Sequence, residues 1–146
     1  MREFSHAFEL PIGRDKVFPL FTPKGEEAWV PGWKPNFLQP KSGETGRGMV
    51  FTTIEASGAT AIWTCLDYIP LAGIARYFRV IADRRASIVE VTCTEVNSKR
   101  TIVRVSYQHV PLTPEGNAEI EALDEGEFRR DIQGLRNLVM PLLNAA

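Results

Sequence analysis

Two histidines, His6 and His109, are the residues of this chain with an ordinary pKa near neutrality, which suits them to proton transfer. Each lies in a segment with alternating polar and apolar side chains. His6 shares its predicted strand face with Phe4 and Phe8, and His109 shares its face with Tyr107. Two interpretations stay open: an acid–base group at a cavity wall, or a histidine that only forms a hydrogen bond with a neighbour.

Charged side chains on strand faces are the next candidates. Tyr77 and Arg79 alternate with Phe78 and Val80, so each pair occupies one face of a strand. An inward Arg79 can pair with a ligand carboxylate or enolate, whereas an outward Arg79 is a solvated cation, and the alternation does not decide between them. Glu95 is either a base with a raised pKa or the end of a strand emerging into water, and we favour the second.

Residues 17–40 combine three short helical turns with a dense set of aromatic side chains. The segment reads VFPLFTPKGEEAWVPGWKPNFLQP, and its prolines break the helical turns. It is expected to lay four aromatic rings over an apolar interior: Phe18, Phe21, Trp29 and Trp33. Such an aromatic lid is typical of a pocket, so the sequence favours a small-molecule binding domain.

Several well-known chemical motifs are missing from the sequence. It contains no GxSxG, P-loop, HExxH, paired-cysteine zinc spacing or glycine-rich dinucleotide turn, so no cofactor and no metal site are expected. Cys65 and Cys93 are far apart and lie in apolar, strand-like segments. They are expected to be buried free thiols in a reduced cytoplasm.

The composition bounds the class of protein. A chain of 146 residues with 44% hydrophobic content is expected to form one domain, residues 1–146. Lys and Arg number 17 against 18 Asp and Glu, so no basic surplus predicts nucleic-acid binding, and Arg84-Arg85 is interpreted as a solvated turn. No apolar run is long enough for membrane insertion, and no signal peptide is evident, so a cytoplasmic protein is expected.

Hydrophobic periodicity predicts the elements that must position these residues. Residues 3–10 alternate as a half-buried strand. A short helix is predicted from Gly13 to Phe18, and another from Thr22-Pro23, with Glu26 and Glu27 near its positive end. Six further strands separated by short turns are predicted at 36–41, 48–56, 59–69, 74–82, 86–96 and 100–110. Connections this short predict antiparallel neighbours.

The C-terminal part changes to a helical period near residue 115. Apolar residues recur mostly at three and four, from Ile120 to Leu142, which predicts one long amphipathic helix that Pro141 ends or kinks. A curved antiparallel sheet that grips this helix would bury every apolar face.

The order of elements resembles that of the START-related, polyketide-cyclase-like (SRPBCC) superfamily. The resemblance rests on VFPLFTPKGEEAWVPGWKP, on Ile62-Trp63 before Asp67-Tyr68, and on the strand residues 77–80. It implies an α+β helix-grip fold, with a curved seven-stranded antiparallel sheet around a long C-terminal helix and two short helices after the first strand. It also implies a cavity for lipids, polyketides or other apolar ligands.

The resemblance also implies an arrangement of the candidate site. The first strand would lie antiparallel to the last, with His6 roughly opposite Tyr107 and His109 near Phe4. His109, Tyr107 and His6 are therefore the catalytic candidates. The aromatic residues either line a cavity or fill a solid core, and the resemblance favours lining. The expected ligand-binding residues are Phe18, Phe21, Trp29, Trp33, Phe51, Trp63, Tyr77, Arg79, Tyr107, His109, Phe128, Ile132 and Leu135.

Three functions remain open at this point. The first is binding of a small hydrophobic or amphipathic ligand, such as a lipid, a polyketide or an aromatic-like molecule. The second is a cyclase, dehydratase or isomerase using the same cavity, and the third is a co-chaperone-like interaction domain. A cavity lined in part by polar groups favours ligand binding or catalysis. A filled interior with an exposed apolar patch favours the interaction domain. The expected state is a monomer or weak homodimer.

Overall fold

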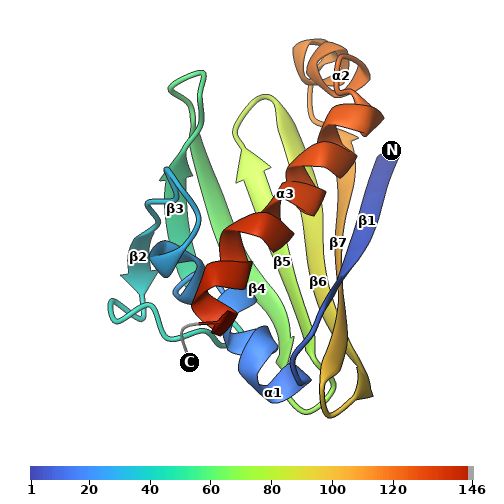
Figure 1. Ribbon diagram of the computed structural model, residues 1–146. Helices are drawn as coiled ribbons and strands as arrows, with labels where there is room; N and C mark the ends of the chain where they lie inside the picture. Colours follow the sequence, from blue (N-terminus) through green and yellow to red (C-terminus); the bar gives the residue numbers. More distant parts are fainter. Residues whose placement is uncertain (145–146) are drawn as a thin grey trace.

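The computed structural model describes residues 1–144, which form one antiparallel sheet with helices on one of its faces (Figure 1). The sheet has seven strands in the order β1-β7-β6-β5-β4-β3-β2. The strands are β1 (Arg2–Leu10), β2 (Asn36–Gln39), β3 (Val50–Ile54), β4 (Thr60–Ile69), β5 (Ile74–Ile81), β6 (Arg85–Asn97) and β7 (Arg100–Pro111). The helices are α1 (Arg14–Val17), the 3-10 helices η1 (Phe18–Phe21) and η2 (Gly25–Ala28), α2 (Pro114–Glu121) and α3 (Glu125–Asn144).

The strand alternation in the sequence follows from a sheet with one buried face. On β5, buried and half-buried residues alternate along the whole strand. The inward set on the neighbouring strands is rich in β-branched and aromatic side chains, which suit a pleated surface. Every neighbouring pair in the sheet is antiparallel, as the short connections predict. The predicted helix-grip fold is confirmed.

One glycine shows how tight these connections are. Gly73 closes the turn between β4 and β5 with a φ of 69°, a conformation that disfavours other residues. A Cβ at this position would also lie 2.3 Å from the backbone oxygen of Cys93. The Cys93 N–H donates a hydrogen bond of 2.7 Å to the Gly73 carbonyl, so the turn is locked against β6.

Helix α3 crosses the face of the sheet diagonally (Figure 1). It buries Ile132 and Val139, and partly buries further apolar side chains from Phe128 to Leu143. The predicted long C-terminal helix is confirmed as α3, but the prediction that it runs unbroken from near residue 115 is wrong, because α2 ends at Glu121 and α3 starts after Asp124. The Asp124 carboxylate accepts a hydrogen bond of 2.8 Å from the Gly126 N–H, which starts α3 in a new direction.

Pro141 lies inside α3, and the helix continues to Asn144. Of the two predicted alternatives, that Pro141 ends or kinks the helix, the first is wrong. No helix within residues 1–144 is long and apolar enough to span a membrane.

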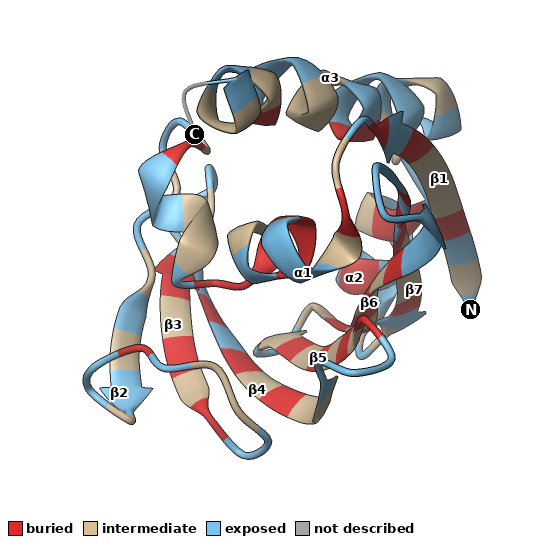
Figure 2. Ribbon diagram, turned by 60° about the horizontal axis from the view of Figure 1, so that its bottom comes forward, coloured by how far each residue is buried: buried red, intermediate tan, exposed pale blue. Residues whose placement is uncertain are grey.

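The short helices after β1 lie on the same side of the sheet as α3, with a gap between the ribbons of α1 and α3 (Figure 2). Val17, Phe18 and Phe21 are buried there, and Phe18 stacks on Tyr68 of β4. The short helices and α3 therefore lie on the same side of the sheet and bound the space above it.

The pairing of β1 with β7 is antiparallel, as the resemblance implies, but its register differs from the expected one. Phe4 pairs with Tyr107, and His6 pairs with Val105. The expectation that His6 lies opposite Tyr107 is wrong by two residues, because β1 begins at Arg2, which pairs with His109.

Candidate ligand-binding cavity

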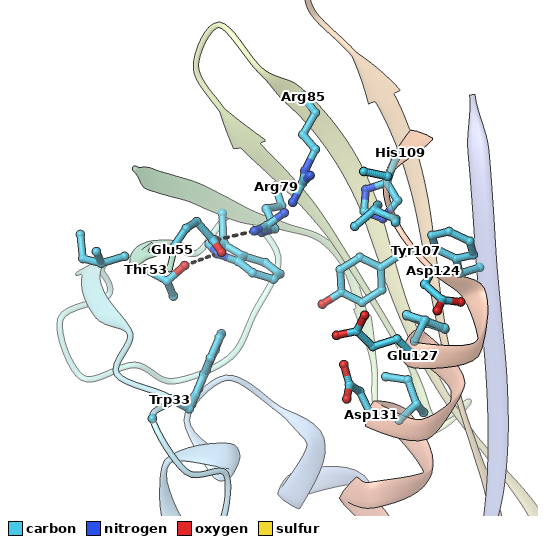
Figure 3. Close-up of a pocket in the computed structure, with 18 of the residues that line it drawn as sticks. Trp33, Thr53, Glu55, Arg79, Arg85, Tyr107, His109, Asp124, Glu127 and Asp131 are labelled. Carbon is cyan, nitrogen blue, oxygen red and sulfur yellow. Dashed lines mark hydrogen bonds and ion pairs between the residues drawn. The ribbon is translucent and has the colours of Figure 1, made fainter. Parts of the chain in front are cut away.

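A cavity of about 690 Å³ lies between the sheet and α3 (Figure 3). Strands β3 to β7 line it on the sheet side, the segment after η2 lines one edge, and α3 lines the opposite side. We call this space the outer cavity. A second space of about 240 Å³ adjoins it and shares part of its wall, including Trp33, Trp63, Tyr107 and Ile132. We call this second space the inner chamber.

Packed aromatic rings form the wall between the two spaces. Trp63 stacks on Phe51 with ring centroids 5.3 Å apart, and Trp33 meets Trp63 edge-on at 5.9 Å. The Trp63 indole N–H donates a hydrogen bond of 3.0 Å to the Thr53 hydroxyl, and the Trp33 indole donates one of 2.8 Å to the Pro23 carbonyl. Both indoles are therefore fixed in orientation before any ligand arrives.

Arg79 points into the outer cavity, which the sequence left undecided. Its side chain is only 8% exposed and forms an ion pair with Glu55. The guanidinium carbon lies 5.3 Å from the centre of the Trp63 ring, a cation–π contact. The charge of Arg79 is thus compensated by a carboxylate and an aromatic face.

Arg85 is a cavity residue that the sequence analysis missed. It is the first residue of β6, on the same face as Ser87 and Val89, and its side chain is 17% exposed. Its Nε has no hydrogen-bond partner among residues 1–144, and its Nη1 lies 3.7 Å from a Glu119 oxygen. Burial, followed by the nearby charge of Arg79, lowers its pKa from the ordinary value.

The interpretation of Arg84-Arg85 as a solvated turn is therefore wrong for Arg85. Arg84 differs from it: its guanidinium forms ion pairs with Glu115 and Glu119 of α2. Extending the predicted strand 86–96 by one residue would have placed Arg85 on the inward face.

His109 lies on the cavity wall and is 5% exposed. Its Nδ1 is 2.8 Å from the Ser87 hydroxyl, and its ring packs edge-on against Phe4. Burial, followed by the positive charges of Arg85 and Arg79, lowers its pKa to about 4. The imidazole is therefore neutral at pH 7.

Tyr107 stands beside His109, with ring centroids 5.6 Å apart, and reaches into the cavity. Figure 3 shows its hydroxyl near Glu127 and Asp131 of α3, across the cavity from Arg79 and Arg85. Burial is the main cause of its raised pKa. The sheet side thus carries Arg85 and the Arg79–Glu55 ion pair, whereas the helix side carries exposed carboxylates.

His6 takes no part in this cluster. Its Nε2 lies 2.8 Å from the Gln133 Oε1 on α3, and it does not line either space. The expectation that His6 lies close to Tyr107 and His109 at the cavity is wrong. His6 instead joins β1 to α3.

Glu26 is the second residue that the sequence analysis missed. Its carboxyl lines the inner chamber, which is otherwise walled mostly by apolar and aromatic side chains. Burial raises its pKa to about 8. The residue as a whole is half-buried and lines the chamber. The sequence placed Glu26 and Glu27 near the positive end of a helix. Of the two, Glu27 is the exposed one, and it pairs with Lys24 at 3.0 Å.

Most of the predicted ligand-binding residues line one of the two spaces. These are Phe21, Trp33, Phe51, Trp63, Tyr77, Arg79, Tyr107, His109, Phe128, Ile132 and Leu135. Phe18 and Trp29 do not, because Phe18 stacks on Tyr68 and the Trp29 indole is bonded to the Leu20 carbonyl beneath Phe21. Glu95 is exposed near the end of β6, as favoured from the sequence.

Both cysteines, Cys65 and Cys93, are buried free thiols, as expected. Within residues 1–144, no group of three or more His, Cys, Asp or Glu side chains is arranged to hold a metal ion.

No family model and no curated protein matches the sequence. Solved structures do match the fold. Norcoclaurine synthase from Thalictrum flavum aligns with a TM-score of 0.69 at 12% identity, over 95% of this chain and 86% of the synthase. This chain has the helix-grip fold.

Two further helix-grip structures are similar. The Zhui aromatase/cyclase from Streptomyces sp. R1128 aligns with a TM-score of 0.61 at 16% identity, over 94% of this chain and 84% of that one. A protein from Mesorhizobium loti aligns with a TM-score of 0.67 at 17% identity, over 94% of this chain and 96% of that one. These matches confirm the helix-grip fold that the resemblance implies.

Proposed function

We propose that this helix-grip protein binds an amphipathic small molecule in the outer cavity, with an apolar or aromatic body and one anionic group at Arg85. The observation that carries the proposal is the Arg85 guanidinium, which is largely buried beside aromatic walls with its Nε unpartnered among the described residues. Arg85 has one long ion pair, 3.7 Å to Glu119, and a buried Nε–H without a partner is costly. A ligand carboxylate, enolate or sulfonate would satisfy that donor with a charge-assisted hydrogen bond.

The charges around the cavity favour one anionic group rather than several. Arg79 is already paired with Glu55, and Lys34 at the cavity edge is exposed to water. Arg85 is the largely buried lining cation whose Nε is unpartnered among residues 1–144. Across the cavity, the exposed carboxylates of Asp124, Glu127 and Asp131 would repel a polyanion. A neutral body with a single acidic group fits this distribution.

The size and lining of the cavity suit a small molecule. Its volume of about 690 Å³ lies within the range of roughly 300–1,000 Å³ that is usual for ligand sites. Trp33, Trp63 and Phe128 offer flat apolar surfaces to a ring system. A co-chaperone-like interaction domain is the less favoured alternative, because it would not need a cavity. A protein without a use for the cavity would gain stability by filling it with side chains.

Catalysis in the same cavity is a second candidate function. The neutral His109 imidazole, oriented through Ser87 and adjacent to Tyr107, can accept a proton from a ligand. Two of the similar structures are called a synthase and an aromatase/cyclase, and a cyclase-type reaction here remains a proposal.

Titration with anilinonaphthalene sulfonate, an aromatic anion whose fluorescence rises in apolar surroundings, tests the binding proposal. Arg85→Gln is expected to weaken binding about tenfold or more, because it removes a charge-assisted contact. Arg76→Gln is the matched control, since Arg76 lies on β5 and pairs with Asp67 and Glu90 outside the cavity. The Arg76→Gln variant is expected to bind anilinonaphthalene sulfonate with the affinity of the wild type. Equal weakening by both substitutions, or by neither, would contradict the proposal.

A further inference from the structure

The inner chamber has a different chemical character from the outer cavity. Its walls are mainly apolar, from Phe21 and Phe51 to Val89, Val91 and Leu135. The ionisable groups that face it are Glu26 of η2, Tyr77 of β5, Tyr107 of β7 and Asp131 of α3. Among residues 1–144, no cationic side chain lines it, in contrast to the outer cavity.

Glu26 is held at this wall by the backbone of the short helices. Its N–H donates a hydrogen bond of 2.9 Å to the Thr22 carbonyl, and the neighbouring Gly25 N–H donates one of 3.0 Å to the Thr22 hydroxyl. The Glu26 carboxyl forms no hydrogen bond or ion pair with any residue from 1 to 144, so it is available to a ligand.

Tyr77 supplies a second unpartnered polar group in the same chamber. The residue is 4% exposed, and its hydroxyl is a buried group without a hydrogen-bond partner in the described part of the chain. Burial, with a further contribution from the Glu26 charge, raises its pKa, so the phenol remains a hydrogen-bond donor. A buried donor without a partner is costly, and a ligand oxygen would satisfy it.

We propose that Glu26 exchanges a proton at the carbon next to a carbonyl group of a ligand in the inner chamber, while the Tyr77 hydroxyl donates a hydrogen bond to the carbonyl oxygen. The Glu26 carboxylate takes the proton, and the C–H electron pair becomes the C=C bond of an enolate. The carbonyl π electrons move onto the oxygen at Tyr77. Glu26 then returns the proton to the same carbon or to a conjugated one, so the step needs no oxidant, reductant or co-reactant.

The environment of Glu26 suits this role. Burial raises its pKa to about 8, so the carboxylate is a stronger base than an exposed one, and both protonation states are accessible near neutral pH. Apolar walls also exclude water, which strengthens the Tyr77 contact with developing negative charge on the oxygen. The ligand class is a neutral ketone or enone with an apolar body.

This activity goes beyond the proposed binding function, although it uses a chamber next to the same cavity. A two-ring ketone such as 2-tetralone is of suitable size for a chamber of about 240 Å³. The test follows the loss of its C1–H proton signal in D₂O by NMR, with and without the protein. Binding of the ketone is measured separately from the indole N–H signals of the tryptophans.

The wild-type protein is expected to accelerate the exchange, with a rate that rises with pH to a midpoint of about 8 because the base must be deprotonated. Glu26→Gln is expected to bind the ketone but lose catalysed exchange by roughly a hundredfold or more. Tyr77→Phe is expected to retain binding and slow exchange at least about tenfold. Glu27→Gln, one residue away and exposed, is the matched control and is expected to exchange at the wild-type rate.

Wild-type exchange in Glu26→Gln would overturn the inference, and so would a failure of the protein to bind or accelerate exchange of the ketone. The sulfonate titration of the Arg85 variants measures the binding function independently. A protein that binds the sulfonate through Arg85 but does not act on the ketone would therefore retain the proposed function and lose the further one.

Discussion

Burial opposes the ionisation of two side chains that face the cavity and its inner chamber. His109 has its pKa lowered to about 4, and Glu26 has its pKa raised to about 8. Both side chains are therefore largely neutral at pH 7, although one is a base and the other an acid. The free energy of folding must then depend on pH through these two groups, in opposite directions.

The Glu26 effect is a loss of stability as pH rises. Its folded-state pKa of about 8 lies above the ordinary value of 4.5, so the folded protein binds more protons than the unfolded chain between these two pH values. The loss of folding free energy caused by ionising the buried Glu26 carboxyl is absent below pH 4.5 and complete above pH 8. Glu26→Gln is expected to remove it and to raise the free energy of unfolding at pH 8 by roughly 2–4 kcal/mol. Urea unfolding at pH 5 and pH 8 measures this, and equal pH dependence in variant and wild type would contradict it.

The His109 effect is a loss of stability as pH falls. Its folded-state pKa of about 4 lies below the ordinary value of 6.5, so the unfolded chain binds more protons between these values. Stability present above pH 6.5 is lost on acidification. His109→Gln is expected to reduce the loss between pH 6.5 and pH 4 by about 2–3 kcal/mol, measured by urea unfolding. A variant that loses stability in parallel with the wild type would show that His109 ionises freely when folded.

At the residue scale, strand alternation predicted part of the site. Tyr107 and His109 lie on the inward-facing side of β7, as the alternation predicts, and Arg79 lies on the buried face of β5. Glu26 could not be predicted in this way, because it lies on a one-turn 3-10 helix, which has no apolar period from which to infer direction. Arg85 was missed because a dipeptide of two arginines resembles a solvated turn.

At the element scale, the strands were the easiest to predict and the C-terminal helix was the hardest. Turn residues separate the strands clearly, so each predicted range overlaps an observed strand. The apolar stripe continues from Ile120 through Leu123 into α3, which concealed the break at Asp124. An aspartate such as Asp124 can start a new helix, but it can also occur inside an unbroken helix. The sequence therefore does not separate α2 from α3, whereas the structure does.

Gly25 determines how closely η2 approaches η1, and therefore where Glu26 lies. A Cβ on Gly25 would lie 2.0 Å from the Pro19 carbonyl oxygen, which is backbone and cannot move freely. Gly25→Ala is expected to destabilise the fold by at least about 2 kcal/mol and to displace Glu26 from the chamber. Thermal or urea unfolding measures the first effect, and ketone exchange measures the second.

Gly46→Ala is the matched control for Gly25→Ala. A Cβ at Gly46 would meet no atom within 4 Å, so this substitution is expected to leave stability and exchange nearly unchanged. Equal stability of the two variants would mean that η1 and η2 can separate without cost, and that Gly25 does not position Glu26.

At the scale of the whole molecule, the open sheet leaves β1 and β2 as its edges. β2 has only four residues and exposes Leu38, which limits the surface it offers to a second copy. A monomer or weak homodimer remains the prediction, and light scattering that shows a stable higher oligomer would contradict it.

The central claim is that a ligand enters between the sheet and α3, and the three tryptophans allow a direct test. Trp33 and Trp63 line the cavity, whereas Trp29 lies outside it with its indole bonded to the Leu20 carbonyl. On addition of anilinonaphthalene sulfonate, the indole N–H NMR signals of Trp33 and Trp63 are expected to shift, and that of Trp29 is expected to stay in place. Shifts confined to exposed apolar positions such as Leu38 and Ile62, with Trp33 and Trp63 unchanged, would contradict the account.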